Sequence, residues 1–162
     1  MGVSASIPAR MSASARTMLV TTITDDYYFG VSMRVWHETC SPENISTILG
    51  HPPSLARRKG STRRSAGSPA VYPRNYWCLD FDTEGALADR IASVAQFLQP
   101  RADAMVSLIQ SGGLAEIYAF VAPELTTVVL QLDPSLLTTI GRAGVKLSIE
   151  IVPPPKRDGS GP

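Results

Sequence analysis

The pattern of apolar and polar positions predicts five strands in this chain, four of them alternating and one, residues 114–121, apolar on both faces apart from Glu116. They span residues 28–36, 76–81, 114–121, 126–132 and 145–151. Because successive side chains of a strand point to opposite faces, this alternation indicates a sheet with one buried face. The last strand alternates most clearly, and its apolar positions are residues 145, 147, 149 and 151. Turn residues Pro123-Glu124 predict that the third and fourth strands form an antiparallel hairpin.

Apolar positions at helical spacing predict four short helices between the strands. The first begins at Ser41, a capping residue followed by Pro42, and ends at Gly50. The second is capped by Asp82 or Thr83 and ends at Pro100. The third ends at Gly112-Gly113, and the fourth opens at Asp133-Pro134. Each presents one apolar stripe, so each is expected to dock on the sheet.

The resulting order is β-α-β-α-α-β-β-α-β, which predicts an α+β fold. We expect a single mixed or antiparallel sheet of about five strands, with helices packed mainly on one face. We expect residues 25–152 to form one domain, with residues 1–24 as a disordered leader and residues 153–162 as a disordered tail. The leader contains no acid in its first 24 residues, a composition that transit peptides share, and Met11 or Met18 are alternative starts.

Composition narrows the class of protein without naming a function. The 162 residues fit one domain, and 44% hydrophobic residues with 18% charged residues are typical of a globular protein. The formal net charge is +1, so any electrostatic function depends on a local patch. Cys40 and Cys78 are expected to be reduced, and no apolar run approaches the length of a membrane span. These features predict a cytoplasmic protein without a membrane partner.

Several segments together resemble a known bacterial family. They are the strand Tyr28-Phe29-Gly30-Val31-Ser32-Met33-Arg34-Val35, the helix Pro42-Glu43-x-Ile45-x-x-Ile48-Leu49-Gly50, the pair Lys59-Gly60, the motif Trp77-x-Leu79 and the final strand Val145 to Ile151. Over residues 26–152 the chain resembles the family of domain of unknown function 4279. The resemblance implies a small α+β domain and brings no established catalytic residues, although some such domains are neighbours of toxin–immunity genes.

Residues 51–75 form a long segment that is rich in Ser, Gly and Pro and contains no acid. We expect this segment to be an irregular, mobile basic loop. Its candidate partner-binding residues are Arg57, Arg58, Lys59, Arg63, Arg64 and Arg74. Such a loop is usually only solvated, but it can also bind an acidic protein, or nucleic acid through residues 57–74, where Tyr72, Tyr76 and Trp77 follow closely.

The candidate chemical groups are few. Cys40 precedes a helix N-terminus and His37 is close in sequence, so these two residues are the candidate pair for an enzyme. His51 and Cys78 complete the set of soft metal ligands, but they do not form a second close pair, and we predict no metal site and no cofactor. The sequence therefore favours a non-catalytic protein-interaction module, an immunity or accessory factor, over nucleic-acid binding and over an enzyme.

Overall fold

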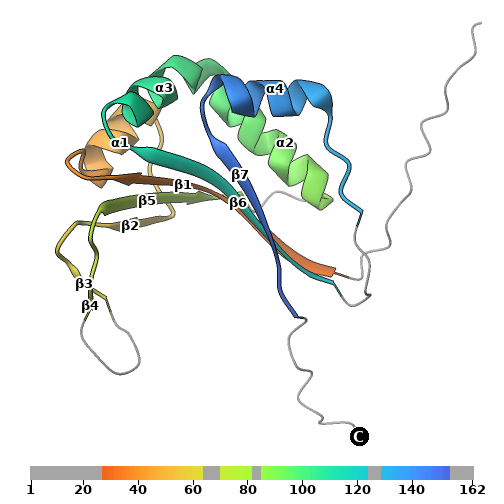
Figure 1. Ribbon diagram of the computed structural model, residues 1–162, viewed down its shortest axis with the longest axis horizontal. Helices are drawn as coiled ribbons and strands as arrows, with labels where there is room; N and C mark the ends of the chain where they lie inside the picture. Colours follow the sequence, from red (N-terminus) through yellow and green to blue (C-terminus); the bar gives the residue numbers. More distant parts are fainter. Residues whose placement is uncertain (1–26, 64–69, 82–84, 124–128, 154–162) are drawn as a thin grey trace, which may run out of the picture.

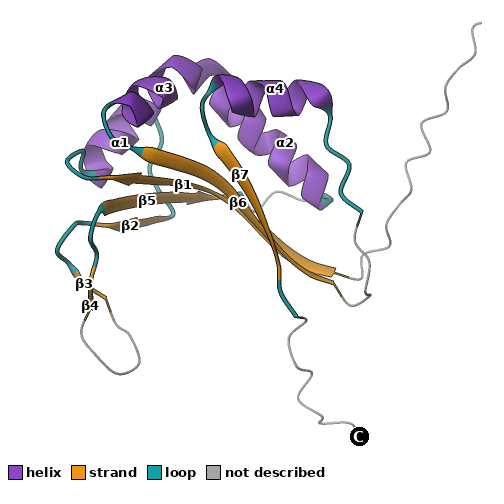
Figure 2. Ribbon diagram, viewed as in Figure 1, coloured by secondary structure: helices purple, strands orange, loops and turns teal. Residues whose placement is uncertain are grey.

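The computed structural model describes residues 27–63, 70–81, 85–123 and 129–153, which form a sheet and a layer of helices on one of its faces (Figures 1 and 2). The sheet has five strands in the order β2-β5-β1-β6-β7. These are β1 (Tyr27–His37), β2 (Leu55–Arg57), β5 (Asn75–Asp80), β6 (Leu114–Pro123) and β7 (Lys146–Ile151). Because β1 pairs antiparallel with β5 and β6 while β6 and β7 run parallel, the sheet is mixed and the predicted α+β class is confirmed.

Four α-helices cover one face of this sheet: α1 (Pro42–Leu49), α2 (Leu87–Leu98), α3 (Ala102–Gln110) and α4 (Pro134–Arg142). A 3-10 turn at Gln99–Arg101 separates α2 from α3 at Pro100. The α1 start is as predicted, because Ser41 Oγ accepts from the amide of Asn44 and Gly50 adopts φ 61° at the end. None of the helices in the described residues is long and apolar enough to span a bilayer.

The core lies between the helices and the inner face of the sheet. Register pairs Met33 with Leu79 on one side and with Ile117 on the other, so these side chains share that inner face. They pack against the apolar stripes of the helices, such as Ile91 of α2 and Met105 of α3, both fully buried. Trp77 is buried too, and its indole donates to Ser46 Oγ at 3.1 Å, which ties β5 to α1.

The predicted strand over residues 126–132 is wrong in the part that can be examined. Residues 129–132 are irregular, and residues 124–128 lie outside the described residues. The predicted hairpin therefore does not form; β6 pairs with β1 and β7 instead. The fifth strand of the sheet is β2, which comes from the segment that we expected to be irregular.

The segment 51–75 contains more structure than its composition indicated. Besides β2, it holds a small two-stranded sheet of β3 (Thr62–Arg63) and β4 (Ala70–Val71). Sequence propensity missed these strands because they are two or three residues long and gain their stability from pairing, not from a hydrophobic pattern. Whether the segment is mobile stays a prediction, and residues 64–69 lie outside the described residues, as do residues 1–24 and 154–162.

Two further expectations need correction. Helix α2 is capped at Ala86, whose amide donates to Asp89 Oδ2 at 3.0 Å, while the expected caps Asp82 and Thr83 lie outside the described residues. The apolar side of β7 is not sealed in the core, since Ile149 is 43% and Ile151 69% exposed. Alternation predicted the face of these side chains correctly, but the core covers only the start of this edge strand, where Leu147 packs against it.

Candidate functional site

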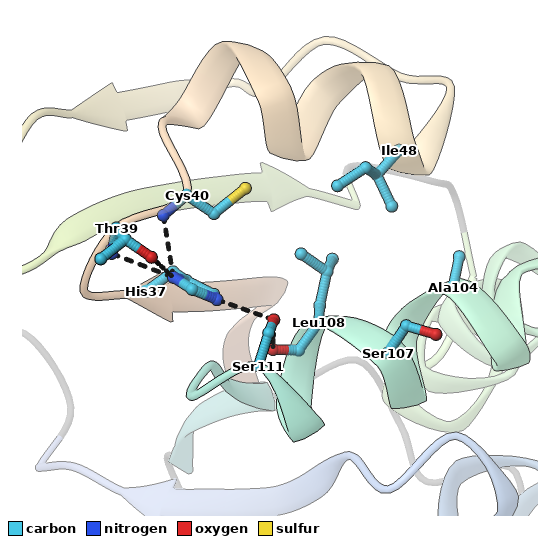
Figure 3. Close-up of a pocket in the computed structure, with 8 residues that line it drawn as sticks. All are labelled: His37, Thr39, Cys40, Ile48, Ala104, Ser107, Leu108 and Ser111. Carbon is cyan, nitrogen blue, oxygen red and sulfur yellow. Dashed lines mark hydrogen bonds between the residues drawn. The ribbon is translucent and has the colours of Figure 1, made fainter.

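A hollow of about 400 Å³ lies where β1 ends, between α1 and α3 (Figure 3). Its lining comes from the turn after β1, from α1 and from α3 and its C-cap: His37, Thr39, Cys40, Ile48, Ala104, Ser107, Leu108 and Ser111. It therefore brings together the two residues that the sequence named as a candidate catalytic pair.

His37 holds this corner of the fold together. Its side chain is 2% exposed, and its Nδ1 accepts from the amide of Cys40 at 2.9 Å and from the amide of Thr39 at 3.1 Å. Backbone amides only donate, so the ring proton is on Nε2, which donates to Ser111 Oγ at 3.0 Å. Ser111 in turn donates to the carbonyl of Leu108 at 2.9 Å. The imidazole thus links the end of β1 to the end of α3.

Close packing reinforces this link. A Cβ placed on Gly113 would lie 3.1 Å from His37 Cδ2 and only 2.6 Å from the carbonyl oxygen of Leu108. Residue 113 must therefore be glycine for the ring to fit beneath the end of α3. The Gly112-Gly113 pair, at which the sequence predicted the end of a helix, also makes room for this histidine.

Cys40 lies beside this imidazole, but the imidazole does not act as a base toward its thiol. Its thiol donates to the carbonyl of Ser41 at 3.8 Å, and Figure 3 shows the sulfur pointing away from the ring and toward the hollow. Desolvation by burial raises the pKa of the Cys40 thiol, so the protonated form is favoured. Since the lone pair of His37 Nδ1 is engaged by two amides, the arrangement does not generate a thiolate.

The remaining soft ligands lie elsewhere. His51 Nδ1 is 2.6 Å from the carbonyl of Pro52, and its ring meets Phe97 edge-on at 5.8 Å. Cys78 lies on β5 and donates its thiol to Asp80 Oδ1 at 3.6 Å. Within the residues that the structure describes, no group of three or more His, Cys, Asp or Glu side chains is placed to hold a metal ion.

Ion pairs with two glutamates hold much of the basic segment. Arg58 contacts Glu43 at 3.0 Å, while Lys59 at 2.9 Å and Arg74 at 3.0 Å both contact Glu38. The hydrogen bond from Lys59, followed by that from Arg74, lowers the pKa of the Glu38 carboxyl. Glu38 lies in the β1–α1 connection and Glu43 in the first turn of α1. The sequence gave no sign of this pairing because more than a dozen residues separate the partners.

The other basic candidates are placed differently. Arg57 lies in β2, is exposed, and donates only to the carbonyl of Ala56 at 2.8 Å among the described contacts. Arg63 lies in β3, and Arg64 lies outside the described residues. Of the side chains that can be examined, Arg57 is therefore the candidate without a carboxylate partner.

The second candidate site is the sheet face that the helices leave uncovered, which we call the open face. Its central residues come from three neighbouring strands: Ser32, Arg34 and Trp36 of β1, Tyr76 and Cys78 of β5, and Glu116, Tyr118 and Phe120 of β6. No helix of the described residues covers them (Figure 2). The polar alternate positions of β1 indicated this face in the sequence, but its cross-strand neighbours depended on the register.

Arg34 lies at the centre of the open face. Its guanidinium stacks on the Tyr118 ring, 3.5 Å from the ring centroid, and its Nε donates to Ser32 Oγ at 3.1 Å. Tyr118 donates its hydroxyl to Glu150 of β7, a bond that raises the pKa of the tyrosine. Next to this group the rings of Trp36 and Tyr76 lie 5.4 Å apart. The result is an aromatic and cationic surface held in place by neighbouring side chains.

Gly30 explains how the aromatic row continues along β6. A Cβ at this position would lie 2.4 Å from the ring of Phe120, so the ring occupies the space above the glycine. Such cross-strand packing of an aromatic ring over glycine fills an otherwise bare position of a sheet.

Comparison with known proteins identifies a family for most of the chain. Residues 25–153 match the model of the family described as Domain of unknown function (DUF4279). Neither the curated proteins nor the solved structures contain a match to the chain.

Proposed function

This chain belongs to the DUF4279 family, and we propose that it is a non-catalytic protein-interaction module that binds its partner on the open face of the sheet. The observation that carries the proposal is the group of half-buried side chains on that face, Arg34, Trp36, Tyr76 and Tyr118. Tryptophan, tyrosine and arginine are the residues most enriched at energetic hot spots of protein interfaces.

Besides the residue types, the arrangement of these side chains supports binding of a partner. Stacking on Tyr118 and the bond to Ser32 hold the Arg34 guanidinium in one orientation. A side chain that is already fixed loses less conformational entropy when a partner contacts it. Arg34 therefore presents an ordered cation, flanked by rings that can pack against a partner.

The basic segment extends the same surface. Arg57 pairs in register with Tyr76, so its side chain shares the open face, and the β3–β4 hairpin projects on the side away from the helices (Figure 1). With Arg34 and Arg57 both on this side, we expect an acidic protein partner. The candidates Arg58, Lys59, Arg63, Arg64 and Arg74 would border that contact. A role as an immunity or accessory factor in the bacterial cytoplasm is consistent with the free thiols of Cys40 and Cys78.

Nucleic-acid binding through residues 57–74 is the weaker alternative. The ion pairs of Arg58, Lys59 and Arg74 place two carboxylates inside the cationic segment, and these reduce its attraction for phosphates. An enzyme using His37 and Cys40 is weaker still, because the hydrogen bonds of His37 serve the fold.

The test compares two arginine substitutions of equal charge. The tagged wild-type chain is first used to capture a stoichiometric partner. The affinity of that partner is then measured for the wild type, for Arg34→Ala and for Arg142→Ala. Arg142 is exposed at the end of α4, on the helix side of the molecule. We expect Arg34→Ala to weaken binding by about 30-fold, the effect of a hot-spot residue, and Arg142→Ala to leave it unchanged. Equal affinities of the two variants for a protein partner would refute the open face as the site.

A further inference from the structure

Within the part of the chain that the structure describes, one edge of β7 has no partner strand. This strand lies at the end of the sheet and pairs with β6 alone among the described strands. The amide of Val152 donates to the carbonyl of Val121 at 2.9 Å, so the even-numbered residues turn their backbone groups toward β6. By alternation, residues 147, 149 and 151 turn their N–H and C=O groups to the free edge. An edge of this kind is a template for another strand.

The side chains of β7 show that this edge is also apolar. Ile149 and Ile151 are 43% and 69% exposed, although their register neighbours Ala119 and Val121 on β6 are at most 1% exposed. The side chains of these two isoleucines are thus left partly uncovered at the edge of the core. A further strand beside β7 would cover them.

The sequence of β7 is complementary to itself when it is read in the opposite direction. An antiparallel pair of β7 strands centred on Ser148 would place Lys146 of each copy opposite Glu150 of the other. The same register sets Leu147 opposite Ile149, and these are residues whose backbone groups point to the free edge. Opposite charges and apolar pairs both stabilise neighbouring strands.

Neighbouring registers lack this match. Centring the pair on Leu147 would set Lys146 opposite Ser148, and centring it on Ile149 would set Ser148 opposite Glu150. Each of these leaves the charged side chains without an opposite charge directly across the pair. In the described residues Lys146 is exposed and makes no ion pair, and Glu150 uses only its Oε2 for Tyr118. Both groups are therefore available for the pairing.

We propose that the chain forms a two-fold symmetric homodimer in which the β7 strands pair antiparallel about Ser148, joining the two five-stranded sheets into one. A two-fold contact of this kind is isologous, so one surface complements itself. The partner is a second copy of this chain, because the complementarity is internal to six residues of one strand. The proposal uses the sheet edge and does not depend on what binds the open face.

The first experiment measures the mass of the full chain by sedimentation over a range of concentrations. We expect the wild type to be a dimer. We expect Lys146→Glu to raise the dissociation constant of the dimer by about 10-fold or more, because it replaces two attractive pairs by two repulsive ones. Combining Lys146→Glu with Glu150→Lys restores complementary pairs and is expected to restore the dimer. Arg57→Glu, with the same change of charge on the opposite sheet edge, is the control.

The second experiment does not depend on the affinity. At the two-fold axis Ser148 faces its own copy in a non-hydrogen-bonded pair, with about 4.5 Å between the Cα atoms, a separation that a disulfide spans. Mild oxidation of Ser148→Cys is expected to give a covalent dimer, whereas the parent chain with Cys40 and Cys78 stays uncrosslinked. A monomer at every concentration with no Ser148→Cys crosslink, or a dimer indifferent to Lys146→Glu, would overturn the proposal.

Discussion

Replacing His37 by alanine tests the assignment of this residue to the fold. The substitution removes the acceptor for the amides of Thr39 and Cys40 and the donor to Ser111. Thr39 is exposed, so water can replace its bond, but Cys40 is half-buried. A buried amide left without an acceptor costs about 1–3 kcal/mol, and the loss of a packed side chain adds to it. We expect His37→Ala to lower the free energy of unfolding by about 2–4 kcal/mol.

Urea unfolding followed by tryptophan fluorescence measures this loss, because Trp77 is fully buried in the native state. With a slope of about 2 kcal/mol per molar urea, the midpoint should fall by about 1–2 M. His37→Asn is the matched control, since an asparagine side chain can accept from the amide two residues on, and it should lose less stability. A His37→Ala variant as stable as the wild type would refute the structural role of the imidazole and reopen its role in chemistry.

Three other predictions follow from local contacts. Gly30→Ala should cost about 1–3 kcal/mol through its clash with Phe120, and a double-mutant cycle with Phe120→Ala should recover most of that loss in urea unfolding. Because the pKa of Glu38 is lowered, its pairing with Lys59 stabilises the fold above the ordinary carboxyl pKa of 4.5, and this stabilisation is lost as the pH falls through the lowered pKa. Glu38→Gln should therefore flatten this part of the pH–stability profile. Because burial raises its pKa, Cys40 should react slowly with iodoacetamide at neutral pH and faster as the pH rises through the thiol range, which mass spectrometry can follow; rapid alkylation at neutral pH would contradict this.

The sequence predicted those elements that carry a long hydrophobic period or a clear cap. Strand β1 and helix α1 are examples, since the alternation through Val31, Met33 and Val35 and the Ser41 cap with Gly50 each encode one outcome. The short strand β2 was not predictable in this way, because three residues show no period and their pairing with β5 is long-range. The irregular residues 129–132 show the reverse case, in which an alternating pattern does not form a strand.

The candidate sites were predictable only in part. His37 and Cys40 stood out by residue type, but the hydrogen bonds that assign the imidazole to the fold come from Ser111, far away in the chain. Arg34 lies between the apolar positions Met33 and Val35, which indicates the polar side of its strand, yet its stacking on Tyr118 required the register of β1 with β6. Sequence patterns give the face of a side chain, whereas tertiary pairing decides what it meets.

The central claim is that the open face remains accessible in the full chain. Trp36 lies on that face and is half-buried, whereas Trp77 lies in the core and is fully buried. Acrylamide quenching of the two single-tryptophan chains, Trp77→Phe and Trp36→Phe, compares them directly. We predict clear quenching of Trp36 and protection of Trp77; equal protection of both would show that the open face is covered and would contradict the account.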